Sequence, residues 1–169
     1  MTRRSLAGVV CSLALVATLG ARTSATPVAD AAQAGDAVAL RALLKQGADV
    51  NSSQGDGMTA LHWAALHGDT TMVSMLVAAG ANLRATTRLG GFTALHLASQ
   101  SGQSAVIGAL IGAGADVHVR TSTGATALLH AARAGDVEGV SRLLASYWAF
   151  FASSSCSLAS PSYSFAIAS

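Results

Sequence analysis

Charged residues are scarce in this chain: of its 169 residues, 11% are Asp, Glu, Lys or Arg, and the formal net charge is +2. Three of the ten basic residues, Arg3, Arg4 and Arg22, precede residue 25, so residues 26–169 hold seven basic and eight acidic residues, a net charge of −1. Binding to a nucleic-acid backbone depends on clustered Lys and Arg. The scarcity therefore argues against a nucleic-acid partner.

Cysteine is also scarce, with Cys11 and Cys156 as the two residues of this type. Cys11 lies in a segment that we expect to be removed, which would leave Cys156 alone. One thiol cannot form an intramolecular disulfide, so a disulfide framework is excluded for the mature chain.

A hydrophobic run long enough to span a membrane is missing as well. Residues 6–19 form an uncharged apolar run of 14 residues, whereas a membrane-spanning helix needs about 20. Two arginines precede this run, and Thr23-Ser24-Ala25 follows it with the small residues that a signal peptidase needs. We therefore predict a signal peptide over residues 1–25, export to the periplasm or the medium, and no membrane attachment of the mature chain. An uncleaved membrane-anchoring helix is the alternative, and Leu19-Gly20-Ala21 is a second candidate cleavage site.

What the chain does have is an internal repeat. The stretch "TALHWAALHGD" at residues 59–69 returns as "TALHLASQSGQ" at residues 93–103 and, more loosely, as "TALLHAARAGD" at residues 126–136. The copies start 34 and 33 residues apart. Repetition at a period of about 20–50 residues predicts a solenoid, in which each unit is stable only when stacked on its neighbours.

Each unit is predicted to be a pair of short helices. A glycine that can adopt a left-handed conformation ends the first helix, at Gly35, Gly68, Gly102 and Gly135. A Gly-Ala pair ends the second helix, at Gly47, Gly80 and Gly114. The first helix has an N-cap threonine, at Thr59, Thr93 and Thr126. An aspartate follows the first glycine and caps the second helix, at Asp36, Asp69 and Asp136, whereas the third unit has the weaker cap Gln103.

Large aliphatic residues recur at offsets 5, 8 and 9 from the first glycine, which is the i, i+3, i+4 spacing of one helical face. The set is Leu40, Leu43 and Leu44; Val73, Leu76 and Val77; Ile107, Leu110 and Ile111; Val140, Leu143 and Leu144. A helix of about nine residues is marginal alone in water, so we expect each stripe to be buried against the next unit. Truncation of Leu76 or Leu110 to alanine should cost about 2–5 kcal/mol.

These features together resemble the ankyrin repeat. The resemblance rests on Gly57-Met58-Thr59-Ala60-Leu61-His62-Trp63-Ala64-Ala65, on Gly68-Asp69 and on Ala79-Gly80-Ala81-Asn82. It spans about residues 28–145, as an incomplete first unit, two full units and a last unit cut off after Leu144. Alanine stands where the family has proline after the capping threonine, and in the last unit Leu129 takes the histidine position, with His130 next.

The resemblance implies an all-α ankyrin-repeat solenoid of stacked helix-turn-helix units with projecting β-hairpin loops, over residues 26–145. It also implies a concave surface, built from the hairpins and the first helices, that binds a protein partner. The family's variable, outward positions here include Asp56, Met58, Leu66, His67, Leu89, Phe92, Gln100, Ser122, Thr123 and Arg133. Met58 and Phe92 are candidate anchors because exposed Met and aromatic residues tend to mark interfaces, although single exposed apolar side chains are also ordinary.

The sequence favours a non-catalytic interaction module. The chain contains no Gly-x-Ser-x-Gly elbow or comparable motif, and its Gly-rich stretch at residues 112–114 lacks the lysine of a phosphate-binding loop. We therefore expect no catalytic site and no cofactor. The alternatives are a structural or truncated repeat fragment with no dedicated partner and, with least support, a hydrolase.

Histidine also recurs, at His62, His96 and His130, in steps of 34 residues. Stacked helices lie about 10 Å apart, whereas a zinc ligand lies about 2.1 Å from the ion, and His130 is out of register. We therefore predict no metal site. We expect His62 and His96 to form hydrogen bonds near their threonines instead.

Residues 146–169 break the pattern, and we predict an irregular tail there. The segment holds nine serines, no charge and six of the eight aromatic residues. It could extend the last helix and cover the open end of the stack as a hydrophobic plug, drive self-association as a disordered segment, or reflect a change of reading frame near codon 145.

Overall fold

The computed structural model describes residues 26–154 of the chain, with side chains described through residue 149. Over these residues the chain forms four pairs of helices. The pairs are α1 (Pro27–Gln33) and α2 (Ala37–Lys45), α3 (Ala60–His67) and α4 (Thr70–Ala78), α5 (Ala94–Gln100) and α6 (Ser104–Gly112), and α7 (Ala127–Ala134) and α8 (Val137–Ser154). The predicted signal peptide, residues 1–25, lies outside the described residues.

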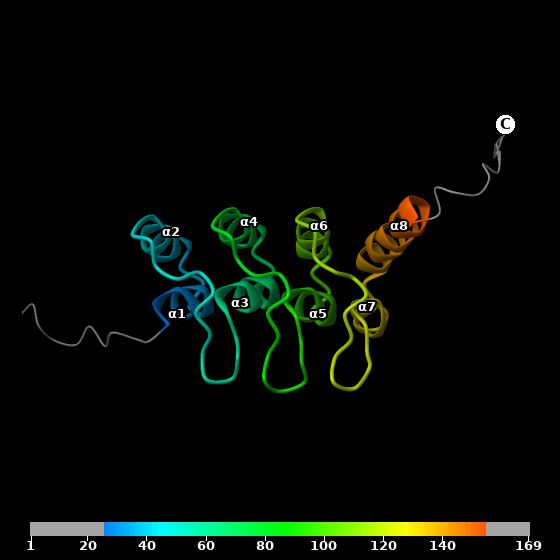
Figure 1. Cartoon of the computed structure of the whole chain (residues 1–169), viewed down its shortest axis with the longest axis horizontal. Coiled ribbons are helices and arrows are strands. Elements are labelled where there is room, and N and C mark those ends of the chain that lie inside the picture. The colour runs from blue at the N-terminus through cyan, green and yellow to red at the C-terminus, as the bar shows by residue number, and fades with distance from the viewer. Residues whose placement is uncertain (1–25, 155–169) are drawn as a thin grey trace, which may run out of the picture.

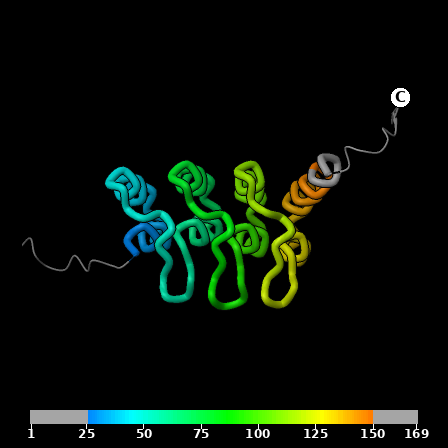
Figure 2. Tube along the Cα trace, viewed as in Figure 1, coloured from blue at the N-terminus to red at the C-terminus, as the bar shows by residue number. Residues whose placement is uncertain are grey.

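The helix pairs are stacked in a row, as the repeat predicted. The first helices α1, α3, α5 and α7 form one row, in which each contacts the next, and the second helices α2, α4, α6 and α8 form a parallel row (Figure 1). The three loops that join successive pairs project side by side beyond the row of first helices (Figure 2). The architecture is therefore the all-α solenoid that the sequence implied.

The predicted start and stop signals act as expected. Thr93 and Thr126 accept hydrogen bonds from the third backbone amide of α5 and α7, both at 3.4 Å. Gly68 and Gly135 end α3 and α7 with φ of 79° and 74°, a left-handed conformation that costs glycine little. Gln103, the one departure among the second-helix caps, makes no side-chain hydrogen bond to α6.

The aliphatic stripes form a continuous core along the stack. Leu40, Leu76, Leu110 and Leu143, one from each second helix, are each at most 1% exposed and belong to a single cluster. Small residues of the first helices fill the space between them, at Ala32, Ala64, Ala98 and Ala131. Alanine at these positions lets neighbouring helices approach closely, because it adds little volume.

Each connecting loop is a short β-hairpin. Ser53 pairs with Thr59, and Arg120 with Thr126, in isolated antiparallel bridges. In the middle hairpin the amide of Thr87 donates a hydrogen bond to the carbonyl oxygen of Phe92 at 2.9 Å. Below, these loops are called hairpin 1 (residues 53–59), hairpin 2 (87–93) and hairpin 3 (120–126).

Main-chain hydrogen bonds also connect the hairpins to one another. The amide of Arg88 in hairpin 2 donates to the carbonyl oxygen of Asp56 in hairpin 1 at 2.8 Å. The amide of Ser122 in hairpin 3 donates to the carbonyl oxygen of Gly90 in hairpin 2 at 2.9 Å. The three hairpins therefore form one hydrogen-bonded platform.

The last helix differs from the prediction. The sequence suggested that the repeat stops near residue 145 and that an irregular tail follows, but α8 continues through Ser154, so residues 146–154 are helical. The second helices α2, α4 and α6 are each followed by a glycine at positive φ, Gly47, Gly80 and Gly114. No such glycine follows Leu144, so the chain has no left-handed stop there and the helix continues.

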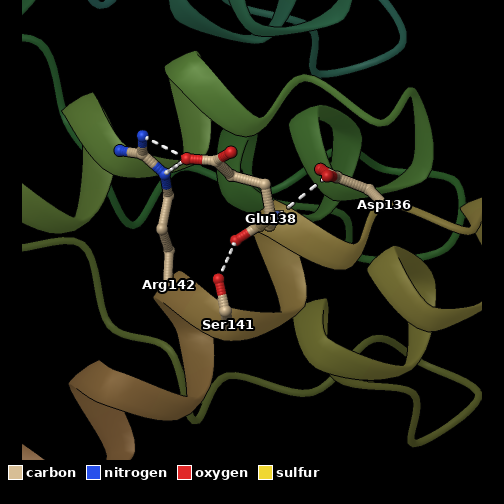
Figure 3. Close-up of polar contacts among 5 residues, drawn as sticks. Asp136, Glu138, Ser141 and Arg142 are labelled. Atoms are coloured by element: carbon tan, nitrogen blue, oxygen red, sulfur yellow. Dashed lines mark hydrogen bonds and ion pairs between the residues drawn. The ribbon is translucent and has the colours of Figure 1, made fainter.

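The first turn of α8 is held by polar contacts (Figure 3). Asp136 accepts a hydrogen bond from the amide of Gly139 at 2.8 Å, and the Oγ of Ser141 donates to the carbonyl oxygen of Glu138 at 2.8 Å. Arg142 forms an ion pair with Glu138 at 2.8 Å, one turn apart. The contact with Asp136 satisfies one of the amides that a helix start leaves unpaired, and the other two contacts stabilise the residues that follow.

Further along α8, the aromatic residues have different surroundings. The hydroxyl of Tyr147 donates to the carbonyl oxygen of Val117 at 3.1 Å, and its ring lies edge-on to His118 with centroids 4.5 Å apart. Trp148 is 75% exposed. Of the two tail aromatic residues whose side chains are described, Tyr147 therefore supports the plug interpretation and Trp148 does not.

Within residues 26–154, no helix has the length and apolar composition needed to cross a membrane.

Candidate protein-binding surface

Two histidines, His62 and His96, each form hydrogen bonds that join one unit to the next beside the hairpins. His62 accepts at Nδ1 from the amide of Thr59 at 3.1 Å, and the Thr59 hydroxyl lies 2.9 Å from the same nitrogen. The Nε2 of His62 lies 3.1 Å from the carbonyl oxygen of Phe92 in the following unit. A carbonyl can only accept, so His62 carries its proton on Nε2.

His96 repeats this arrangement one unit later. Its Nδ1 lies 3.3 Å from the amide and 2.8 Å from the hydroxyl of Thr93, and its Nε2 donates to the carbonyl oxygen of Val119 at 3.1 Å. The hydrogen bonds near the two threonines are those that the sequence predicted. The bonds to Phe92 and Val119 add a link between units.

Burial lowers the pKa of both histidines from the usual 6.5. For His62 the burial of the ring outweighs its hydrogen bond to Phe92, and for His96 the burial is reinforced by nearby His130. Because a neutral ring is what these hydrogen bonds need, the lowered pKa and the geometry agree.

His130 lies elsewhere, because it is one residue out of register. Leu129 occupies the position equivalent to His62 and His96 and is half exposed, while His130 occupies the position of Trp63 and Leu97. The His130 ring lies 5.8 Å from that of His96 and 5.5 Å from that of Phe92, measured between centroids. Side chains of adjacent units therefore approach more closely than the helix spacing of about 10 Å suggested.

These histidines are poorly placed to bind a metal. Both ring nitrogens of His62 and of His96 are already in hydrogen bonds. Within the part of the chain that the structure describes, no three His, Cys, Asp or Glu side chains are grouped to hold an ion.

The hairpins and the first helices α3, α5 and α7 form what we call the candidate surface. Most of the predicted hairpin residues are exposed there, namely Asp56, Leu89, Ser122 and Thr123. Leu89 is the large apolar side chain among them, and it is 80% exposed. Backbone contacts hold it in place, because the Thr87 hydroxyl donates to its carbonyl oxygen at 2.9 Å.

The two predicted anchors, Met58 and Phe92, are less exposed to solvent than the sequence suggested. Met58 is half-buried, and its carbonyl oxygen accepts from the amide of Gln54 at 2.8 Å. Phe92 is also half-buried, and its ring packs on His96 and His130. Phe92 therefore contributes to the packing between units as well as to the surface.

The remaining predicted residues come from the first helices. Leu66 is half-buried and His67 exposed on α3, where the His67 ring lies 6.1 Å from that of Trp63. Gln100 at the end of α5 and Arg133 near the end of α7 are exposed. They line one pocket of about 230 Å³ together with His130 and Ala134.

Two residues that contribute to the candidate surface, the half-buried Trp63 and the buried, pocket-lining His130, were not among those predicted. Trp63 is half-buried and donates from its indole nitrogen to Gln54 at 2.9 Å, and Gln54 in turn donates to Asp30 and Gln33. Both lie four residues after the capping threonine, one position beyond the repeated histidine. This shared position in the repeat is the sequence signal that could have identified both residues.

Comparison with known proteins agrees with the fold. A family model described as ankyrin repeats (3 copies) matches residues 28–121 and residues 95–157. The ankyrin repeat and LEM domain-containing protein 1 homolog of Caenorhabditis elegans is 40% identical over 52 residues. That alignment covers 31% of this chain and 7% of the nematode protein. Repeats of this kind are generally protein–protein interaction modules and are typically non-catalytic.

Proposed function

Because the chain belongs to the ankyrin-repeat family, we propose that it binds a partner protein through the candidate surface, without a catalytic step. The hydrogen bonds from Arg88 to Asp56 and from Ser122 to Gly90 carry this proposal. They align three hairpins into one platform before any partner arrives. A preformed surface lowers the entropy cost of binding, so a few contacts can supply useful affinity.

The chemistry of the platform fits such a role. Leu89 offers an exposed apolar side chain, and Asp56, Ser122 and Thr123 offer polar groups around it. Protein interfaces commonly combine an apolar centre with a polar rim. Phe92, on the same hairpin as Leu89, is held in position by its ring contacts with His96 and His130.

Affinity capture with matched variants tests the proposal. The wild-type chain, Leu89→Ser on hairpin 2 and Val38→Ser on α2 would each be immobilised and exposed to an extract of the source cells. Both Leu89 and Val38 are about 80% exposed, so neither substitution should affect folding. We expect Leu89→Ser to lose a captured protein that wild type and Val38→Ser retain. Equal capture by all three would remove the support for this surface.

We propose further that the chain is exported. The support is the arrangement of residues 1–25, with arginines, an apolar run and small residues in the order of a signal peptide. Intact-mass measurement of the protein from separated cell fractions tests this. A mass that begins at Thr26 in the exported fraction is expected, and a full-length mass confined to the cell interior would contradict it.

Self-association remains a prediction for the end of the chain. Its support within the described residues is an exposed stripe on α8 formed by Val137, Leu144 and Trp148. Sedimentation velocity of wild type and Trp148→Ser tests it, because the substitution should shift any concentration-dependent dimer toward monomer. A wild-type chain that stays monomeric at high concentration would exclude it.

A further inference from the structure

We infer that the pocket between the ends of α5 and α7 holds a carboxylate side chain of the partner protein. Gln100, His130, Arg133 and Ala134 line this pocket, which has a volume of about 230 Å³. The inference rests on the proposed function and adds the chemistry of one contact.

Arg133 supplies an uncompensated positive charge. Within the described residues it has no ion pair and no hydrogen bond, whereas Arg142 pairs with Glu138 (Figure 3) and Arg84 with Asp116. The side chain of Gln100 likewise has no hydrogen-bond partner there. The guanidinium and the amide can each donate to a carboxylate, and a guanidinium can do so with two parallel hydrogen bonds.

His130 is a second, independent indication that the pocket lacks a hydrogen-bonding partner. It is 8% exposed, and its Nε2 is buried with no hydrogen-bond partner in the described structure. His62 and His96, by contrast, have both ring nitrogens bonded. A buried polar atom without a partner costs free energy, and a group supplied by a bound partner would remove that cost.

The charge of the pocket selects the kind of anion. Burial and the nearby guanidinium of Arg133 lower the pKa of His130, so its ring is neutral near pH 7. The lining therefore presents one positive charge and neutral polar groups. This set matches the single charge of an Asp or Glu side chain better than a phosphate group, which carries about −1.5 to −2.

Peptide selection provides a direct test. A random dodecapeptide phage library would be selected on the full chain, and each recovered peptide would be synthesised with its Asp or Glu and with the matching Asn or Gln. Titration calorimetry would then measure the affinity of both forms for wild type, Arg133→Gln and Arg41→Gln. Arg41 is an exposed arginine on α2 and serves as the control, with circular dichroism to check that all variants fold.

We expect acidic peptides to be enriched and Arg133→Gln to weaken their binding about tenfold, with Arg41→Gln unchanged. Neutralising the peptide acid should weaken binding to wild type by a similar factor and have little further effect on Arg133→Gln, since the two groups interact. If Arg133→Gln and neutralisation of the peptide acid weaken binding independently of each other, the inference is overturned.

Two further outcomes separate this inference from the proposed function. If selected peptides depend on Leu89 but not on Arg133 or on an acidic residue, the pocket assignment fails and the binding surface stands. If no selected peptide is sensitive to Leu89, Phe92 or Arg133, both proposals fail together.

Discussion

The Nε2 of His96 donates a hydrogen bond to the carbonyl oxygen of Val119, 23 residues further along the chain, at 3.1 Å. The same ring accepts from Thr93 in its own helix. One side chain therefore connects the start of helix α5 to the residue that precedes hairpin 3, and His62 likewise connects the start of α3 to Phe92 in hairpin 2.

Removal of this ring should weaken the stack. In His96→Ala the carbonyl of Val119 and the hydroxyl of Thr93 lose their partner, and a buried space opens. We expect the free energy of unfolding to fall by about 2–4 kcal/mol, measured by urea denaturation. The control is His67→Ala on the exposed face of α3, which should change it by less than about 0.5 kcal/mol. Similar values for the two variants would show that the inter-unit hydrogen bonds contribute little.

Acid should destabilise the fold through the same histidines. Their folded pKa values lie below the unfolded value of 6.5, so the unfolded chain binds more protons at mildly acidic pH. The stability they provide is complete above about pH 6.5 and is lost as the pH falls below it towards the folded pKa values, at up to about 1.4 kcal/mol per pH unit for each histidine.

Melting temperatures between pH 7.5 and 5 test this dependence. We expect the decrease to be smaller in a double variant with His62→Asn and His96→Asn, where neither position titrates, while His130, whose pKa is also lowered, still contributes. An unchanged slope in the double variant would assign the acid sensitivity to other groups.

Tyr147 and Trp148 form a matched pair on α8. Tyr147→Ala removes the hydrogen bond to Val117 and the packing on His118, so we expect a loss of about 2–4 kcal/mol in unfolding free energy. Tyr147→Phe, which loses the hydrogen bond alone, should cost about 1 kcal/mol. Trp148→Ala should have almost no effect, because this side chain is 75% exposed. If Tyr147→Ala is as stable as Trp148→Ala, residues 146–149 do not cover the end of the stack.

The cap of α6 offers a stabilising change. Asp36 and Asp69 each accept hydrogen bonds from two backbone amides at the start of α2 and α4, whereas Gln103 accepts none at the start of α6. Gln103→Asp should therefore raise the free energy of unfolding by about 0.5–1 kcal/mol. Asp69→Ala, which removes the existing cap at the equivalent position of α4, should lower it by about 1 kcal/mol. A destabilised Gln103→Asp would show that the Gln103 side chain matters more for its packing near Gly68 than for capping.

Local features of the fold could be predicted from the sequence because single residues determine them. Gly68 and Gly135 end helices through their own backbone conformation, and Asp69 caps α4 through atoms two and three residues away. The register of the aliphatic stripes follows from helical geometry alone. The predicted boundary at residue 145 followed the repeat pattern, whereas α8 continues to Ser154, as the plug alternative allowed and as the missing glycine after Leu144 indicates.

The surface was harder to predict, since it depends on contacts between units. From a single repeat Phe92 is predicted to be an exposed anchor. In the structure its ring packs on His96 of the same unit and on His130 of the next unit. The unpaired Nε2 of His130 depends on the packing of three side chains from two units. No pattern within a single repeat contains that information.

The main-chain hydrogen bonds between hairpins have an evolutionary consequence. Amides and carbonyls at Asp56, Arg88 and Ser122 are present whatever the side chain, proline excepted at the donors, whereas Gly90 is constrained by its positive φ of 88°. Mutations at the tips can therefore accumulate while the spacing of the scaffold is preserved. A lineage could exchange one target for another by a few substitutions, and a randomised library at these tips should contain many well-folded members.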